Sequence, residues 1–288
     1  MMLKERRRRL RGWSVNRIVP NGLTVLALCA GLTSIRFALD GRWDFAVCAI
    51  VVAGIFDGLD GRAARILKVT SRFGAELDSL SDFLSFGVAP AVLVYEWSLS
   101  GVRGIGWALA LLFTVCCALR LARFNSEMEE PMAEQTEWSR DYFAGVPAPA
   151  GAALAIVPIM IWLETDGDYA RLAVVNGLVM GCVALLMISR VPTFSMKRFT
   201  IPISYVLPVL LVIGLMFAAL VSAPWITLIA IGLTYLFSIP VTIFNAYRKR
   251  RCEIEAQATE NNPAVRPPEL DPVSAARHER NGEAGLRH

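Results

Sequence analysis

Four aspartates lie at helical spacing inside apolar stretches of this 288-residue chain, at positions 57, 60, 78 and 82. A charged side chain at the centre of a bilayer costs roughly 2.5–3.5 kcal/mol on insertion scales, so four of them oppose folding by about 10 kcal/mol unless they are neutralised. Divalent cations can neutralise them, because hard cations prefer oxygen ligands. The sequence therefore predicts an acidic metal pocket between apolar helices.

The spacing of these residues predicts two helices that face each other. Positions 57, 60, 61, 64 and 65 fall on one face of a helix, and positions 74, 78 and 82 recur at steps of four on another. Four carboxylates carry about four negative charges, which two Mg²⁺ or Mn²⁺ ions would balance. We therefore expect two metal ions, which can together clamp a diphosphate and stabilise a leaving phosphate oxygen.

The composition indicates a polytopic membrane protein. Hydrophobic residues make up 55% of the chain, and the mean hydropathy is +0.48. An all-α fold with about eight transmembrane helices is expected, because each apolar run is long enough to cross about 30 Å of hydrocarbon. The expected spans are 20–38, 43–65, 76–98, 104–124, 147–164, 171–190, 202–221 and 225–246.

Basic residues predict the orientation. They cluster before the first span, between spans two and three, between spans six and seven, and after span eight. The positive-inside rule then places both termini in the cytoplasm, in the inner membrane of a cell. The arginine-rich start favours anionic lipid headgroups, and no nucleic-acid partner is expected. We expect three regions: a basic amphipathic segment over 1–18, a transmembrane catalytic domain over 19–246, and a disordered cytoplasmic tail over 247–288.

Cysteine and histidine offer no alternative chemistry within the expected spans. Five of the six cysteines lie in apolar spans without the spacing of a metal or redox site, and the two histidines, His278 and His288, lie in the tail. Acid–base and metal chemistry in the membrane must therefore rely on carboxylates.

The acidic residues belong to a longer pattern that resembles a known family. Residues 57–82 match the signature D-x2-D-G-x2-A-R-x8-G-x3-D-x3-D of the CDP-alcohol phosphotransferases at every fixed position. The segments 85–91, 120–125 and 145–150 resemble the integral-membrane phosphatidylserine synthase branch of that family.

This resemblance implies a set of roles for the site. Asp57, Asp60 and Asp78 would be the main metal ligands, and Asp82 would share the cluster and act as the base that deprotonates the acceptor hydroxyl. The leaving group would be CMP. Residues expected to border the nucleotide are Asn21, Thr24, Gly61, Ala64, Arg65 and Gly74. For Asn21 a helix cap is an equal alternative, and Arg65 could pair with a phosphate or with an aspartate.

The resemblance to the phosphatidylserine synthase branch also implies that the acceptor is L-serine. Its carboxylate needs a cationic partner, and Arg120 or Arg123 can supply a bidentate one, although both could instead be topology-setting charges. Asn125 and Ser85 are expected nearby, where Ser85 could touch the acceptor or bond to a backbone carbonyl. The expected reaction transfers the phosphatidyl group of CDP-diacylglycerol to L-serine, and the resemblance also implies a homodimer.

Two kinds of alternative stay open. The metal motif is shared across the family, so glycerol phosphate, inositol phosphate or choline could replace serine as the acceptor. From another class, a divalent-cation or proton-coupled transporter could use an acidic cluster as its binding site. A prenyltransferase also binds diphosphate through paired aspartates, but it would leave Gly61, Ala64 and Arg65 without a purpose.

Overall fold

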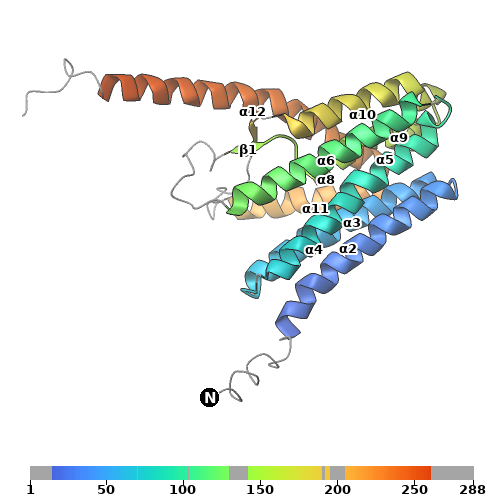
Figure 1. The fold of residues 1–288 in the computed structure, drawn as a ribbon, viewed down its shortest axis with the longest axis horizontal. Coiled ribbons are helices and arrows are strands. Elements are labelled where there is room, and N and C mark those ends of the chain that lie inside the picture. Colours follow the sequence, from blue (N-terminus) through green and yellow to red (C-terminus); the bar gives the residue numbers. More distant parts are fainter. Residues whose placement is uncertain are drawn as a thin grey trace, which may run out of the picture. The chain divides into compact units, whose positions relative to one another are not determined.

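The first two helices form an antiparallel pair. The structure, a computed structural model, describes residues 15–69, 71–102, 104–129, 142–189, 192–194 and 205–260. Helices α2 (Val15–Leu39) and α3 (Trp43–Ile66) lie side by side (Figure 1). The turn between them uses Gly41 at a φ of 70°, a backbone conformation that glycine adopts without steric cost. Ser34 of α2 donates to the carbonyl of Ala46 in α3 over 2.8 Å.

The third helical segment is continuous but changes its winding. It comprises α4 (Arg72–Asp82), η1 (Phe83–Val88), α5 (Ala89–Val94) and η2 (Tyr95–Leu99), and η1 and η2 are π-helical. Such wide turns inside α-helices often occur at functional sites. Here the first of them begins directly after Asp82. The next helix is α6 (Ile105–Glu129), which packs against η1 and α5.

The remaining elements complete the helical domain. They are β1 (Tyr142–Ala144), α8 (Ala148–Ala155), α9 (Val157–Thr165), η3 (Asp168–Arg171), α10 (Ala173–Ile188), β2 (Pro192–Phe194), α11 (Val206–Ser222) and α12 (Pro224–Glu260). Strands β1 and β2 pair in antiparallel fashion, with Tyr142 opposite Phe194. This short ribbon joins the segment before α8 to the segment after α10.

The core is centred on the third segment and on α8 and α9. Phe86, Leu93 and Trp97 of the third segment are 2% exposed or less, and Ile159 of α9 is fully buried. By contrast, α11 has no buried residue. Apolar side chains on this helix are therefore available to lipid.

The fold agrees with the expected polytopic all-α architecture. Five helical segments within the described residues are long and apolar enough to cross a membrane, and α10 and α11 are shorter apolar helices. Helix α3 has the required length, but it carries charged residues at positions 44, 57, 60, 62 and 65. These eight segments coincide with the eight expected spans, displaced by a few residues at their ends.

The first and last helices extend beyond residues 19 and 246, the expected limits of the transmembrane region. Helix α2 already begins at Val15, and α12 continues to Glu260, beyond the expected limit at residue 246. The chain divides into two compact units, Met1–Thr242 and Ile243–His288, and the division falls inside α12. The basic segment up to residue 14 and the tail from residue 261 lie outside the described residues, so their expected roles stay predictions.

Candidate metal and substrate site

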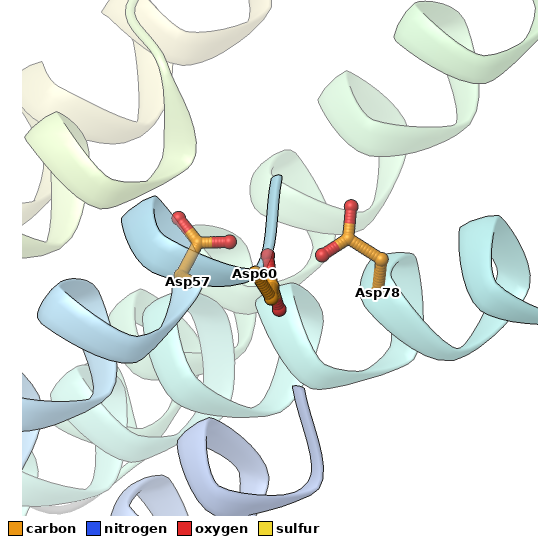
Figure 2. Close-up of side chains that lie close together, drawn as sticks. All are labelled: Asp57, Asp60 and Asp78. Atoms are coloured by element: carbon orange, nitrogen blue, oxygen red, sulfur yellow. The ribbon is translucent and has the colours of Figure 1, made fainter. Parts of the chain in front are cut away.

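Three aspartates from two helices converge on one point. Asp57 and Asp60 lie near the end of α3, and Asp78 lies in α4. One carboxylate oxygen from each lies within 4.8 Å of the others. Figure 2 shows their side chains turned towards the space between the two helices. The fold thus brings together the two motif halves that the spacing placed on facing helices.

Asp82 joins this group through Asp57. The carboxyl groups of these two residues are hydrogen-bonded to each other. Two carboxyl groups in such contact need a shared proton or a nearby cation, since like charges repel. Asp82 also interacts electrostatically with Arg120 of α6. It therefore lies between the three clustered aspartates and a cationic side chain.

Helix α2 contacts the cluster helices through side-chain hydrogen bonds. The Thr24 hydroxyl donates to Oδ2 of Asp60 over 2.6 Å and also lies 3.1 Å from the carbonyl of Pro20. Ser81 of α4 donates to the carbonyl of Thr24 over 3.2 Å. Thr24, Asp60 and Ser81 are each 5% exposed or less. These contacts fix the side-chain direction of Asp60, the most buried of the clustered aspartates.

The cluster fits a hard divalent cation. Carboxylate oxygens within 4.8 Å of one another can share an ion whose ligand distances are about 2.1 Å with only small adjustments. No basic residue in the described ranges forms an ion pair with any of the four aspartates; the ion pair found there joins Arg36 to Asp40. The donor set consists of oxygen atoms only, which suits Mg²⁺ and Mn²⁺.

The expected nucleotide-binding residues lie on α2, on α3 and in α4, and the space around them differs. A side chain added at Gly61 would meet nothing within 4 Å, whereas one at Gly74 would lie 2.9 Å from Oδ1 of Asn21. Arg65 is exposed, and its Nε donates to the carbonyl of Gly61 over 3.0 Å. Ala64 is half-buried. Asn21 lies well inside α2, so it does not cap the start of that helix.

The expected serine-binding residues do not form one group. Ser85 is fully buried and donates to the carbonyl of Ala27 over 3.2 Å. Asn125 donates to the Ser79 hydroxyl over 2.8 Å. Arg123 donates to the carbonyl of Ile188 over 3.0 Å.

The remaining member of this set is Arg120. Its Nε is buried and has no hydrogen-bond partner among the described residues. It is therefore the member whose donor group is available to a ligand.

Two features of the site were not predicted from the sequence. A Cβ at Gly31 would lie only 2.9 Å from Cα of Ser85, so this glycine sets the close contact of α2 with η1. Tyr235 of α12 has a buried hydroxyl without a partner in the described part of the chain, and it interacts electrostatically with Arg120. Neither residue belongs to a local motif, and each gains its place only through packing between helices far apart in sequence.

Comparison with known proteins identifies the family. Residues 17–189 match the family model of the CDP-alcohol phosphatidyltransferases, and residues 204–240 match that of CDP-alcohol phosphatidyltransferase 2. Over 228 residues the chain is 42% identical to the CDP-diacylglycerol–serine O-phosphatidyltransferase of Mycobacterium leprae (strain TN), covering 79% of this chain and 75% of that protein.

More distant relatives extend this similarity. The chain is 38% identical over 232 residues to the enzyme of the same name from Mycobacterium tuberculosis (strain ATCC 25618 / H37Rv), covering 78% of each. It is 33% identical over 167 residues to the archaetidylserine synthase of Methanothermobacter thermautotrophicus, covering 53% of this chain and 70% of that protein. With its helical membrane fold and its acidic cluster in place, the chain belongs to the CDP-alcohol phosphatidyltransferase family.

Proposed function

We propose that this protein transfers the phosphatidyl group of CDP-diacylglycerol to the hydroxyl of L-serine, giving phosphatidylserine and CMP. The convergence of Asp57, Asp60 and Asp78 from two apolar helices carries the proposal, because a diphosphate donor needs charge neutralisation inside a membrane. The serine acceptor is supported by relatives at 38–42% identity over most of the chain that are named for this reaction.

The three clustered aspartates would hold a divalent cation, with Asp82 beside them. When bound, Mg²⁺ or Mn²⁺ supplies positive charge that binds a diphosphate and stabilises the departing phosphate oxygen. A site for two ions is supported by the four carboxyl groups present. Thr24 keeps Asp60 directed at this site through its 2.6 Å hydrogen bond.

Asp82 is the proposed general base. It lies at the edge of the cluster nearest Arg120, so an acceptor held by that arginine would present its hydroxyl to the carboxylate. Asp82 would accept the hydroxyl proton as the oxygen attacks the phosphorus bonded to the diacylglycerol oxygen. The bond from that phosphorus to the bridging diphosphate oxygen then breaks, and CMP leaves.

The nucleotide is proposed to lie over the open face of α3. Gly61 leaves that backbone uncovered, and Ala64 and Arg65 follow on the same helix. Across from them, Gly74 admits the Asn21 side chain. A cytidine diphosphate could approach the α3 backbone closely here, with Arg65 near its phosphates.

The membrane setting is part of the proposal. We propose that the protein lies in the inner membrane as a homodimer, with both termini in the cytoplasm and its basic N-terminal segment on anionic lipid. The distribution of basic residues supports this orientation. Serine would then reach the site from the cytosol and the lipid donor from the bilayer.

The purified protein can be tested with CDP-diacylglycerol and Mg²⁺ or Mn²⁺ against separate acceptors: L-serine, glycerol phosphate, inositol phosphate and choline. We expect CMP release with L-serine. Release with another acceptor alone would keep the reaction class and overturn the acceptor. Absence of CMP release with every acceptor, together with metal uptake into proteoliposomes, would favour a divalent-cation transporter instead.

A further inference from the structure

Two buried polar atoms near the acidic cluster lack partners within the described residues. They are Nε of Arg120 in α6 and the hydroxyl of Tyr235 in α12. Buried polar groups in folded proteins nearly always have a hydrogen-bond partner, so a pair of unsatisfied donors indicates a missing ligand or water. Each residue as a whole keeps some exposed surface, which leaves a small molecule access to it.

The two groups belong to one locality. Arg120 and Tyr235 interact electrostatically with each other, and Arg120 interacts in the same way with Asp82. Both residues lie within the same compact unit, which extends to Thr242 in α12. On α12, Gly232 lies against Val157 of α9: a side chain there would meet Val157 at 3.4 Å. This close contact holds the first half of α12 against the helical core.

The contact that orients Arg120 does not use its N–H groups. Its Cζ lies 5.7 Å from the centre of the Phe124 ring, a cation–π contact that orients a guanidinium without using its N–H groups. Arg123 differs, because its guanidinium bonds to the carbonyl of Ile188 over 3.0 Å and would contact any side chain placed at Gly145. Arg123 thus connects α6 to the end of α10, whereas Nε of Arg120 has no such partner in the described part of the chain.

We propose that Arg120 and Tyr235 together bind the carboxylate of the amino-acid acceptor, so that α12 contributes a specificity-determining residue to the active site. A guanidinium and a phenolic hydroxyl both donate, and a carboxylate accepts two or more hydrogen bonds. The carboxyl and hydroxyl groups of serine are separated by only a few covalent bonds. A carboxylate at Arg120 therefore places the hydroxyl near Asp82. This inference rests on the proposed serine transfer.

The test compares Tyr235→Phe with the wild type in steady-state kinetics. The substitution removes one hydroxyl and keeps the ring. We expect the KM for L-serine to rise about tenfold or more, as for the loss of a hydrogen bond to a charged group, while the KM for CDP-diacylglycerol stays at the wild-type value. Thr234→Val is the matched control, because it removes an exposed hydroxyl from the neighbouring position of α12.

A second variant addresses the arginine without removing its charge. Arg120→Lys keeps the cation but loses Nε and the planar fork, and it should raise the KM for L-serine selectively as well. If both variants retain the wild-type KM for L-serine, or if they lower kcat with both KM values unchanged, the proposed carboxylate subsite is wrong. If the wild type releases no CMP with L-serine, the proposed function fails first. The same variants are then measured with whichever of the tested acceptors supports CMP release. An unchanged KM for that acceptor would show that Arg120 and Tyr235 do not bind it.

Discussion

Removal of one hydroxyl, in Thr24→Val, tests how the acidic cluster is positioned. The Thr24 hydroxyl lies 2.6 Å from Oδ2 of Asp60, within the short range of a charge-assisted O–H···O⁻ bond. Such a bond is worth about 1.5–3 kcal/mol, or about 10- to 150-fold in a binding constant. The hydroxyl has one proton, which the Pro20 carbonyl at 3.1 Å can also accept. We therefore expect the lower end, about a tenfold weakening of metal binding.

The assay is the concentration of Mn²⁺ or Mg²⁺ needed for half-maximal CMP release, supported by direct Mn²⁺ binding. The control is Thr33→Val on the same helix, where an exposed hydroxyl donates to the carbonyl of Cys29 over 2.7 Å. Thr24→Ser should restore the wild-type metal dependence, because it keeps the donor. If Thr24→Val and Thr33→Val require the same metal concentration as the wild type, the hydrogen bond does not position Asp60 for a metal.

Three further predictions follow from the structure, two of them with a matched control substitution. Gly61→Ala and Gly58→Ala both add a methyl group in open space, and each should stabilise α3 by about 0.5–1 kcal/mol in thermal unfolding. Only Gly61→Ala should lower the rate of CMP release. Equal rates in the two variants would exclude nucleotide contact at Gly61. Asp60→Asn should lose both turnover and Mn²⁺ affinity, and wild-type values for both would refute its assignment as a ligand. Gly145→Ala should lower the free energy of unfolding by more than about 1 kcal/mol, because the backbone has a φ of 83° and the added Cβ would lie 2.6 Å from the carbonyl oxygen of Met187. Gly104→Ala is the control, since it adds strain at a φ of 74° without a clash. Equal losses of stability in the two variants would refute the clash.

The sequence predicts the acidic cluster well because its geometry is local. Asp57 and Asp60 are one helical turn apart, and helical periodicity alone places them on the same face. Asp78 lies on the next helix, and the short connection between α3 and α4 leaves few ways to pack the two. Hydropathy predicts the helical segments for a similar reason, since a span needs about 20 consecutive, predominantly apolar residues.

Contacts between helices that are far apart in the sequence could not be predicted in this way. Ser85 matches a family segment, but its hydroxyl donates to Ala27 of α2, and nothing in the local sequence indicates that pairing. Tyr235 looks like an ordinary tyrosine in the middle of an apolar span until the fold brings it to Arg120. The two arginines of α6 also look equivalent in sequence, and only tertiary contacts separate Arg123, which bonds to Ile188, from Arg120.

The ends of the helices were predicted least well. The expected limit at residue 246 rests on the end of hydrophobicity, yet α12 continues to Glu260 through a charged stretch. A helix that leaves the hydrocarbon can continue in water, because each backbone group is already paired within the helix. Hydropathy therefore marks where the apolar environment ends, and the helix itself extends beyond that point.

The most direct test of the proposed reaction follows isotopically labelled L-serine. The purified protein is incubated with CDP-diacylglycerol, Mn²⁺ and the labelled amino acid, and lipid and nucleotide products are measured together by mass spectrometry. We expect labelled phosphatidylserine and CMP in equal amounts, and neither product when a chelator removes the metal. Unlabelled lipid product, CMP release that is independent of serine, or full turnover in chelator would contradict metal-dependent phosphatidyl transfer to serine.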